Sequence, residues 1–123
     1  MSEIRLGAVE SKFADIIWNN EPLRPVELEK LAEAELNWKR TTTLTILKRL
    51  CERGIFQNKD RIITSLISRE EFYALQSEKF VNDTFEGSLP AFLTAFGSRK
   101  KLSDKEVEEL KKVIDSMRSI PVK

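Results

Sequence analysis

The chain has 123 residues, enough for one domain or for one small domain with an appendage. It contains no histidine and one cysteine, Cys51, which excludes an internal disulfide and removes the commonest general base and transition-metal ligand. The formal net charge is +1, so the charge of the whole chain neither favours nor excludes nucleic acid. Because we find no leader-like segment and no run of about 18 apolar residues, we expect a cytoplasmic protein without a membrane partner.

The charge is unevenly distributed along the chain. Residues 37–61 contain seven Lys or Arg and two Asp or Glu, whereas residues 1–36 contain four and eight. A basic cluster of this kind is a typical electrostatic footprint of nucleic-acid binding, although the pI near 7.8 hides it.

Three helices are expected in the first half of the chain. The first covers residues 7–20, where apolar residues recur at helical spacing, and it ends before Pro22. Pro25 suits the first turn of a second helix. A third helix lies within residues 37–54, with Gly54 as its C-terminal cap.

A β-hairpin is expected next. Ile55 and Phe56 begin one short strand, residues 58–61 form a turn, and residues 62–67 form a second strand. Three helices followed by a hairpin is the order of a winged helix-turn-helix, in which the third helix enters a DNA groove.

Helices return in the rest of the chain. Ser68 with Glu71, and Ser103 with Glu106, fit the capping box S-x-x-E, in which side chains satisfy amide donors at a helix start. The first box opens a helix over residues 69–86, the second opens the final helix, and a shorter helix lies between them.

The threonine-rich third helix indicates a binding surface. On a helical wheel its buried side is centred on Thr43, whose hydroxyl should bond a carbonyl one turn back, and includes Ile46, Leu47 and Leu50. The other sides carry hydroxyls suited to base edges and basic groups suited to phosphates. We therefore predict DNA contacts from Lys39, Arg40, Thr41, Thr42, Thr45, Lys48 and Arg49, and from Lys59 and Arg61 in the wing. The alternative, a solvated polar face, fits less well because the face lies in the basic segment of the expected third helix.

The tail holds more large apolar residues than three thin helices can bury. A second copy of the chain would cover them. We predict a homodimer through Phe72, Phe80, Phe85, Phe92, Phe96, Val107, Leu110, Ile114 and Met117. Two alternatives are packing of these residues against the winged helix and a ligand pocket between the aromatic rings.

These elements predict a mainly α fold with a small β-hairpin. Residues 1–67 would form a winged helix-turn-helix DNA-binding domain, and residues 68–123 a C-terminal helical dimerisation domain. Cys51, Trp18 and Trp38 are expected in the core, and the glutamates of the second helix are expected to be solvated: Glu27, Glu29, Glu33 and Glu35.

Two functional classes fit these sequence features. One is a DNA-binding transcriptional regulator, and the other is a winged-helix protein-interaction module that does not read DNA. The basic segment favours the first, because a protein-binding module would more often carry apolar residues there. We find no nucleophile–base pair, metal cluster or phosphate-binding loop, so we expect no enzyme, no cofactor and no metal.

The order and spacing of these features resemble the penicillinase repressor and methicillin-resistance regulator family over nearly the whole chain. The matching residues are Leu6, Glu10, Ile16, Ile17 and Trp18, then Trp38, Thr42, Thr45, Arg49, Leu50 and Gly54, then Ser65 and Leu66, and finally Gly87 and the helix LSDKEVEELKKVI. The resemblance implies a winged helix with a C-terminal dimerisation domain, repression by dimers on palindromic operators, and, in one branch, a membrane sensor-protease that triggers cleavage of the repressor.

The chain departs from the family pattern in several places. Lys39 and Arg40 stand where the family usually has Ser-Pro, so a helix cap is lost and charge is gained. The wing is shorter by about four residues, which limits the reach of its basic residues. Ala95-Phe96 corresponds to the Asn-Phe bond that is cleaved in the family. The cysteine cluster of the copper-sensing branch does not occur in this sequence.

Overall fold

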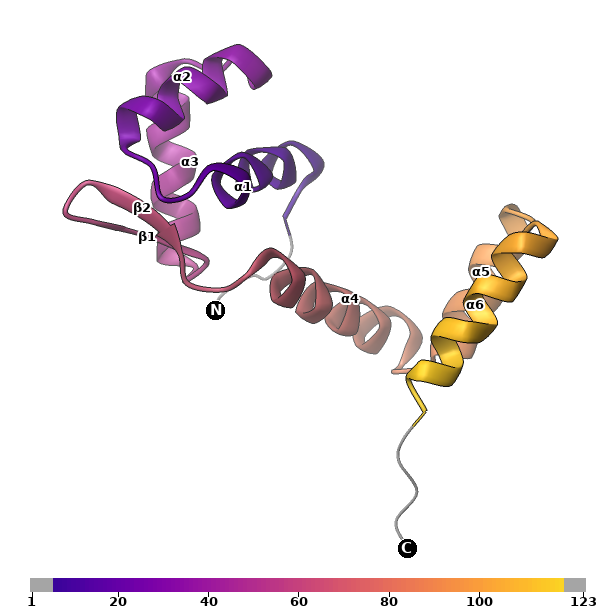
Figure 1. Cartoon of the computed structure of the whole chain (residues 1–123). Helices are drawn as coiled ribbons and strands as arrows, with labels where there is room; N and C mark the ends of the chain where they lie inside the picture. The colour runs from indigo at the N-terminus through magenta and orange to yellow at the C-terminus, as the bar shows by residue number, and fades with distance from the viewer. Residues whose placement is uncertain (1–5, 119–123) are drawn as a thin grey trace, which may run out of the picture. The chain divides into compact units, whose positions relative to one another are not determined.

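The computed structural model describes residues 6–118 (Figure 1). In chain order the elements are α1 (Ala8–Asn20), α2 (Pro25–Leu36), α3 (Arg40–Glu52), β1 (Phe56–Lys59), β2 (Ile62–Ser65), α4 (Arg69–Phe85), α5 (Leu89–Arg99) and α6 (Asp104–Ser116). The predicted mainly helical fold with one small hairpin is confirmed. The chain forms two compact units, one ending at Phe80 and the other beginning at Val81.

Residues at the helix ends explain the bounds of α2 and α3. Pro25 occupies the first turn of α2, and the Glu27 carboxylate accepts a hydrogen bond of 2.6 Å from the Arg24 amide. The helix ends at Asn37, whose φ of +58° is left-handed. Gly54 follows α3 with a φ of +81°, a conformation that glycine adopts without a steric penalty. The predicted helix stop at Gly54 is therefore confirmed.

The core of the first unit lies between the three helices and the hairpin. α1 packs on α2, α2 on α3, β2 on α1, and β1 on α3. Phe13, Leu28, Leu50 and Phe56 are fully buried at its centre. Trp38 packs against this core with its ring centroid 4.9 Å from that of Phe13, as expected for a core anchor.

The hairpin forms a short wing with a two-residue turn. Lys59 pairs with Ile62, so the turn consists of Asp60 and Arg61, which have φ values of +55° and +64°. Two positive φ values in succession are typical of the type I′ turn that matches the twist of a hairpin. Leu23 adds an isolated bridge to Ile63, which fixes the wing to the segment before α2.

The beginning of α4 belongs to the first unit. Phe72 is 1% exposed, and its ring centroid lies 5.7 Å from that of Trp18. Arg69 donates a hydrogen bond of 2.8 Å to Asp15 of α1, and its guanidinium lies 4.9 Å from the centroid of Tyr73. The expected boundary after residue 67 therefore precedes the observed division. The prediction that Phe72 contacts a second copy is wrong, because its side chain is buried within one chain.

The second unit contains α5 and α6. Ser88 accepts a hydrogen bond of 3.1 Å from the Ala91 amide at the start of α5. At the start of α6, Ser103 accepts from the Glu106 amide at 3.1 Å and its own amide donates to the Glu106 carboxylate at 3.0 Å. The predicted capping box is confirmed. No side chain of α5 or α6 is buried.

Candidate nucleic-acid interface

α3 has one buried side and one exposed side, as the helical wheel predicts. Thr43 is fully buried, and its hydroxyl donates a hydrogen bond of 3.1 Å to the Lys39 carbonyl one turn back. Leu47 and Leu50 continue the buried side. The exposed side carries the predicted polar residues Thr41, Thr42, Thr45 and Lys48. The three exposed threonines are therefore not required by the core, in contrast to Thr43.

The start of α3 leaves backbone donors open to an anion. Lys39 occupies the N-cap position and makes no side-chain hydrogen bond to the first turn. The first amide groups of a helix point outward and lie at the positive end of the helix dipole, which favours phosphate. Lys39 and Arg40 therefore stand beside helix amides that no side chain caps.

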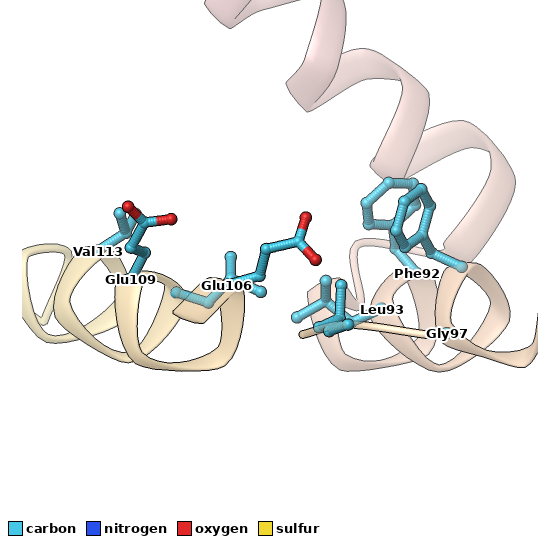
Figure 2. A pocket seen from close by; sticks show the side chains of 9 residues that line it. Phe92, Leu93, Gly97, Glu106, Glu109 and Val113 are labelled. Carbon is cyan, nitrogen blue, oxygen red and sulfur yellow. The ribbon is translucent and has the colours of Figure 1, made fainter. Parts of the chain in front are cut away.

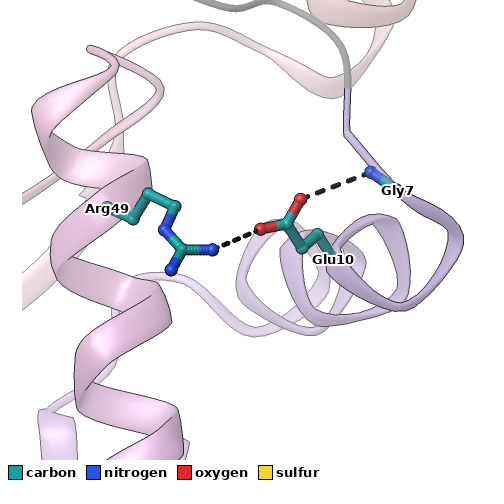
Figure 3. Close-up of polar contacts among 3 residues, drawn as sticks. All are labelled: Gly7, Glu10 and Arg49. Carbon is teal, nitrogen blue, oxygen red and sulfur yellow. Dashed lines mark hydrogen bonds and ion pairs between the residues drawn. The ribbon is translucent and has the colours of Figure 1, made fainter.

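Arg49 is engaged with α1 (Figure 3). Its Nη1 donates a hydrogen bond of 3.2 Å to Oε2 of Glu10, while Oε1 of Glu10 accepts from the Gly7 amide at 3.3 Å. The Arg49 side chain is 49% exposed. This guanidinium ties α3 to the start of α1, and its contribution to a DNA surface would use only the remaining donors.

A cleft of about 530 Å³ lies between α2, α3 and the wing. Three arginines line it, one at the N-cap of α2, one in α3 and one in the turn of the wing, together with two carboxylates and several apolar groups: Arg24, Arg40, Arg61, Glu29, Asp60, Val26, Leu44 and Ile62. Arg40 forms an ion pair with Glu29 of α2, with 3.2 Å between Nε and Oε1. The expectation that the α2 glutamates are merely solvated is wrong for Glu29.

Two members of this cleft, Arg24 and Glu29, were missed by reasoning from the sequence. Both residues lie in the acidic segment 1–36, whereas the predicted site was taken from the basic segment 37–61. A helical wheel of α3 does not show which residues of α2 lie beside it. The sequence carries no local signal for this ion pair, because only the packing of α2 on α3 brings Glu29 to Arg40.

The second unit has an apolar cavity of about 440 Å³ between α5 and α6 (Figure 2). Its lining includes three of the predicted dimerisation residues: Phe92, Phe96 and Leu110. Glu106 and Glu109 bring two carboxylates to the same cavity. Phe96 is 46% exposed, and two further predicted residues, Ile114 and Met117, are 47% and 67% exposed. This unit therefore presents apolar surface that the described chain does not cover.

The remaining candidate groups have structural roles. Cys51 packs beside the core, and burial, with a smaller contribution from Glu52, raises the pKa of its thiol. A raised pKa leaves little thiolate near neutral pH, so the thiol is a poor nucleophile.

Within residues 6–118, no three His, Cys, Asp or Glu side chains lie close enough to hold a metal ion. None of the described helices combines the length and apolar character that a membrane span requires.

The three packed helices, the wing and the exposed side of α3 define a winged helix-turn-helix protein. The model of the penicillinase repressor family matches residues 6–116, so the chain belongs to this family of transcriptional repressors. The methicillin resistance regulatory protein MecI of Staphylococcus aureus is 25% identical over 114 residues, which cover 89% of this chain and 93% of MecI. The penicillinase repressor of Bacillus licheniformis is 22% identical over 115 residues, 90% of each chain. The solution structure of monomeric Bacillus licheniformis BlaI with the blaP half-operator matches 58% of this chain and 93% of that chain, with 22% identity and a TM-score of 0.48.

Proposed function

We propose that this chain is a DNA-binding transcriptional repressor that binds a palindromic operator as a homodimer. The observation that carries the proposal is the two-sided character of α3. Thr43 and Leu47 hold one side in the core, while Thr42 and Thr45 stand exposed on a basic helix. Membership of a family of repressors supports the same function.

The exposed side of α3 divides into two kinds of group. The hydroxyls of Thr41, Thr42 and Thr45 would contact base edges and carry sequence preference. The basic residues would contact phosphates and carry affinity without sequence preference: Lys39, Arg40, Lys48 and, from the wing, Lys59 and Arg61. Both Arg40 and Arg49 are paired with a glutamate at 3.2 Å, and Arg49 would contribute less because its side chain is 49% exposed against 73% for Arg40.

The second unit supports the homodimer. No side chain of α5 or α6 is fully buried within the described chain, and the large apolar side chains of Phe96 and Ile114 are 46% and 47% exposed. Burial of apolar surface stabilises an association by roughly 25 cal/mol per Å² before the cost of ordering. A second copy offers a matching surface by symmetry. Phe72 is buried in the first unit and therefore does not belong to the proposed dimer interface. The other predicted interface residues, from Phe80 to Met117, stay in the proposal.

A sensor protease, which the family resemblance implies, has a poor target here. The corresponding bond, Ala95-Phe96, lies within α5 (Leu89–Arg99), and proteases require an extended backbone, so this helix would have to open first. Ala also replaces the family's Asn. Both features argue against regulated cleavage at this bond, so the proposed function rests on DNA binding and dimerisation.

Selection of bound sequences from a random duplex pool tests the proposal. We expect enrichment of an inverted repeat whose half-sites lie about one helical turn apart. Thr42→Ala with Thr45→Ala should weaken binding to the selected site by roughly 1–3 kcal/mol per lost base contact, with little effect on random duplex. Thr84→Ala, an exposed threonine of α4, is the matched control.

The same selection distinguishes the alternative function. A protein-interaction module would enrich no sequence and would show no salt-dependent binding to random duplex. That result would contradict the repressor proposal.

A further inference from the structure

In the ion pair between Glu29 and Arg40, the carboxylate is mostly buried and the guanidinium is mostly exposed to solvent. The Glu29 side chain is 19% exposed, whereas that of Arg40 is 73% exposed. Glu29 sits on the second turn of α2, within the cleft that Arg24 and Arg61 also line. The carboxylate is therefore largely enclosed by the cleft, whereas the guanidinium is mostly exposed to solvent.

Arg40 is the first residue of α3, and no side chain caps the N-terminal end of this helix. A DNA phosphate that reaches the open amides of this helix also comes within reach of the Arg40 guanidinium. The same phosphate then lies near the Glu29 carboxylate, which is 3.2 Å from Nε of Arg40. Two anions would share one arginine, and their mutual repulsion opposes binding.

We propose that Glu29 is a built-in competitor of the DNA backbone for Arg40, which limits the affinity of each winged helix for DNA of any sequence. This inference rests on the proposed DNA-binding function.

The competition has a consequence for dimers. A phosphate contact carries no sequence information, so Glu29 weakens specific and random complexes by the same factor. A winged helix with low intrinsic affinity depends on a second, linked winged helix to hold it on the operator. Glu29 would therefore make occupancy depend more strongly on dimerisation.

Glu29→Gln in the full chain, measured by anisotropy of labelled random and selected duplexes over a range of salt, tests the inference. Glutamine keeps the side-chain length and has a helix propensity close to that of glutamate. We expect tighter binding by about two- to fivefold per winged helix, which is the range for loss of an exposed ion pair. The slope of log K against log salt should steepen by about 0.9 per winged helix, because Arg40 would then release a counterion without Glu29 taking one up.

Two controls isolate the pair. Glu35→Gln removes an exposed charge from the same helix and should change affinity less than Glu29→Gln does. In an Arg40→Gln background the gain from Glu29→Gln should disappear, since the pair no longer exists.

The outcomes separate this inference from the proposed function. If the parent binds DNA and Glu29→Gln binds equally or more weakly, Glu29 orients Arg40 or is neutral, and the inference is overturned while the function stands. A gain that persists without Arg40, or that occurs on the selected site alone, also overturns it. Absence of DNA binding by the parent at the lowest salt overturns both.

Discussion

The indole Nε1 of Trp18 donates a hydrogen bond of 3.0 Å to the carbonyl of Ile67, and the Trp18 ring lies beside Phe72 one turn into α4. This relationship anchors the start of α4 on the winged helix. The amide of Leu6 reinforces it with a hydrogen bond of 3.1 Å to the Gln76 side chain. The first part of α4 is consequently structural for the DNA-binding unit.

Phe72→Ala should lower the free energy of unfolding of the first unit by about 3–5 kcal/mol, because it removes a fully buried ring and leaves a cavity. Leu75→Ala, on the same helix at 40% exposure, should cost much less. Urea unfolding followed by tryptophan fluorescence measures both, since Trp18 lies against Phe72. Equal costs for the two variants would contradict the assignment of Phe72 to the core.

A fragment of residues 1–80 should unfold cooperatively, whereas a fragment of residues 1–67 should be much less stable. The shorter fragment loses Phe72 and exposes one side of Trp18, and it also loses the ion pair between Arg69 and Asp15. Circular dichroism and thermal unfolding of the two fragments provide the comparison. Similar unfolding temperatures for the two fragments would support the domain boundary after residue 67 that the sequence predicts.

The sequence predicted the local structure well because local rules determine it. Helical spacing identified Thr43 as the buried threonine, and Gly54 marked the end of α3. The assignment of Phe72 failed for a different reason. A helical pattern shows that one side of α4 is apolar, but not whether that side meets α1 or a second copy of the chain.

The candidate site was predicted only in part, for the same physical reason. The exposed residues of α3 follow from one helix and its period. The ion pairs of Arg40 with Glu29 and of Arg49 with Glu10 link residues 11 and 39 positions apart in the chain. Pairs of this kind depend on how α3 packs against α2 and α1, which no local pattern specifies.

Arg61→Gly should stabilise the first unit and weaken DNA binding. Arg61 has a φ of +64°, a conformation that costs a non-glycine residue roughly 1 kcal/mol, so glycine should raise the free energy of unfolding by about that amount. The lost charge should reduce affinity for random duplex and flatten its salt dependence. Arg61→Gln is the control, because it loses the charge but keeps the strained backbone. If it stabilises the unit as much as glycine does, the backbone explanation is wrong.

The last prediction concerns the surface of α6. Leu110→Asp with Ile114→Asp places two charges on the apolar side of this helix, next to the cavity that Leu110 lines. Buried charges without partners are costly, so a dimer that uses this surface should dissociate, while the first unit stays folded. Sedimentation measures the mass, and a gel shift on the selected palindrome measures the affinity, which should fall by about 10²–10⁴ once two winged helices are no longer linked.

The control places two new carboxylates on the other side of α6, and it changes the net charge by more than the test variant because two lysines are lost. Lys105→Asp with Lys112→Asp changes two exposed residues one heptad apart and should leave the mass unchanged. A Leu110/Ile114 variant that stays dimeric would remove α6 from the interface. A monomer that binds the full palindrome as tightly as the parent would break the link between dimerisation and DNA affinity, because that link requires both winged helices to act through one dimer.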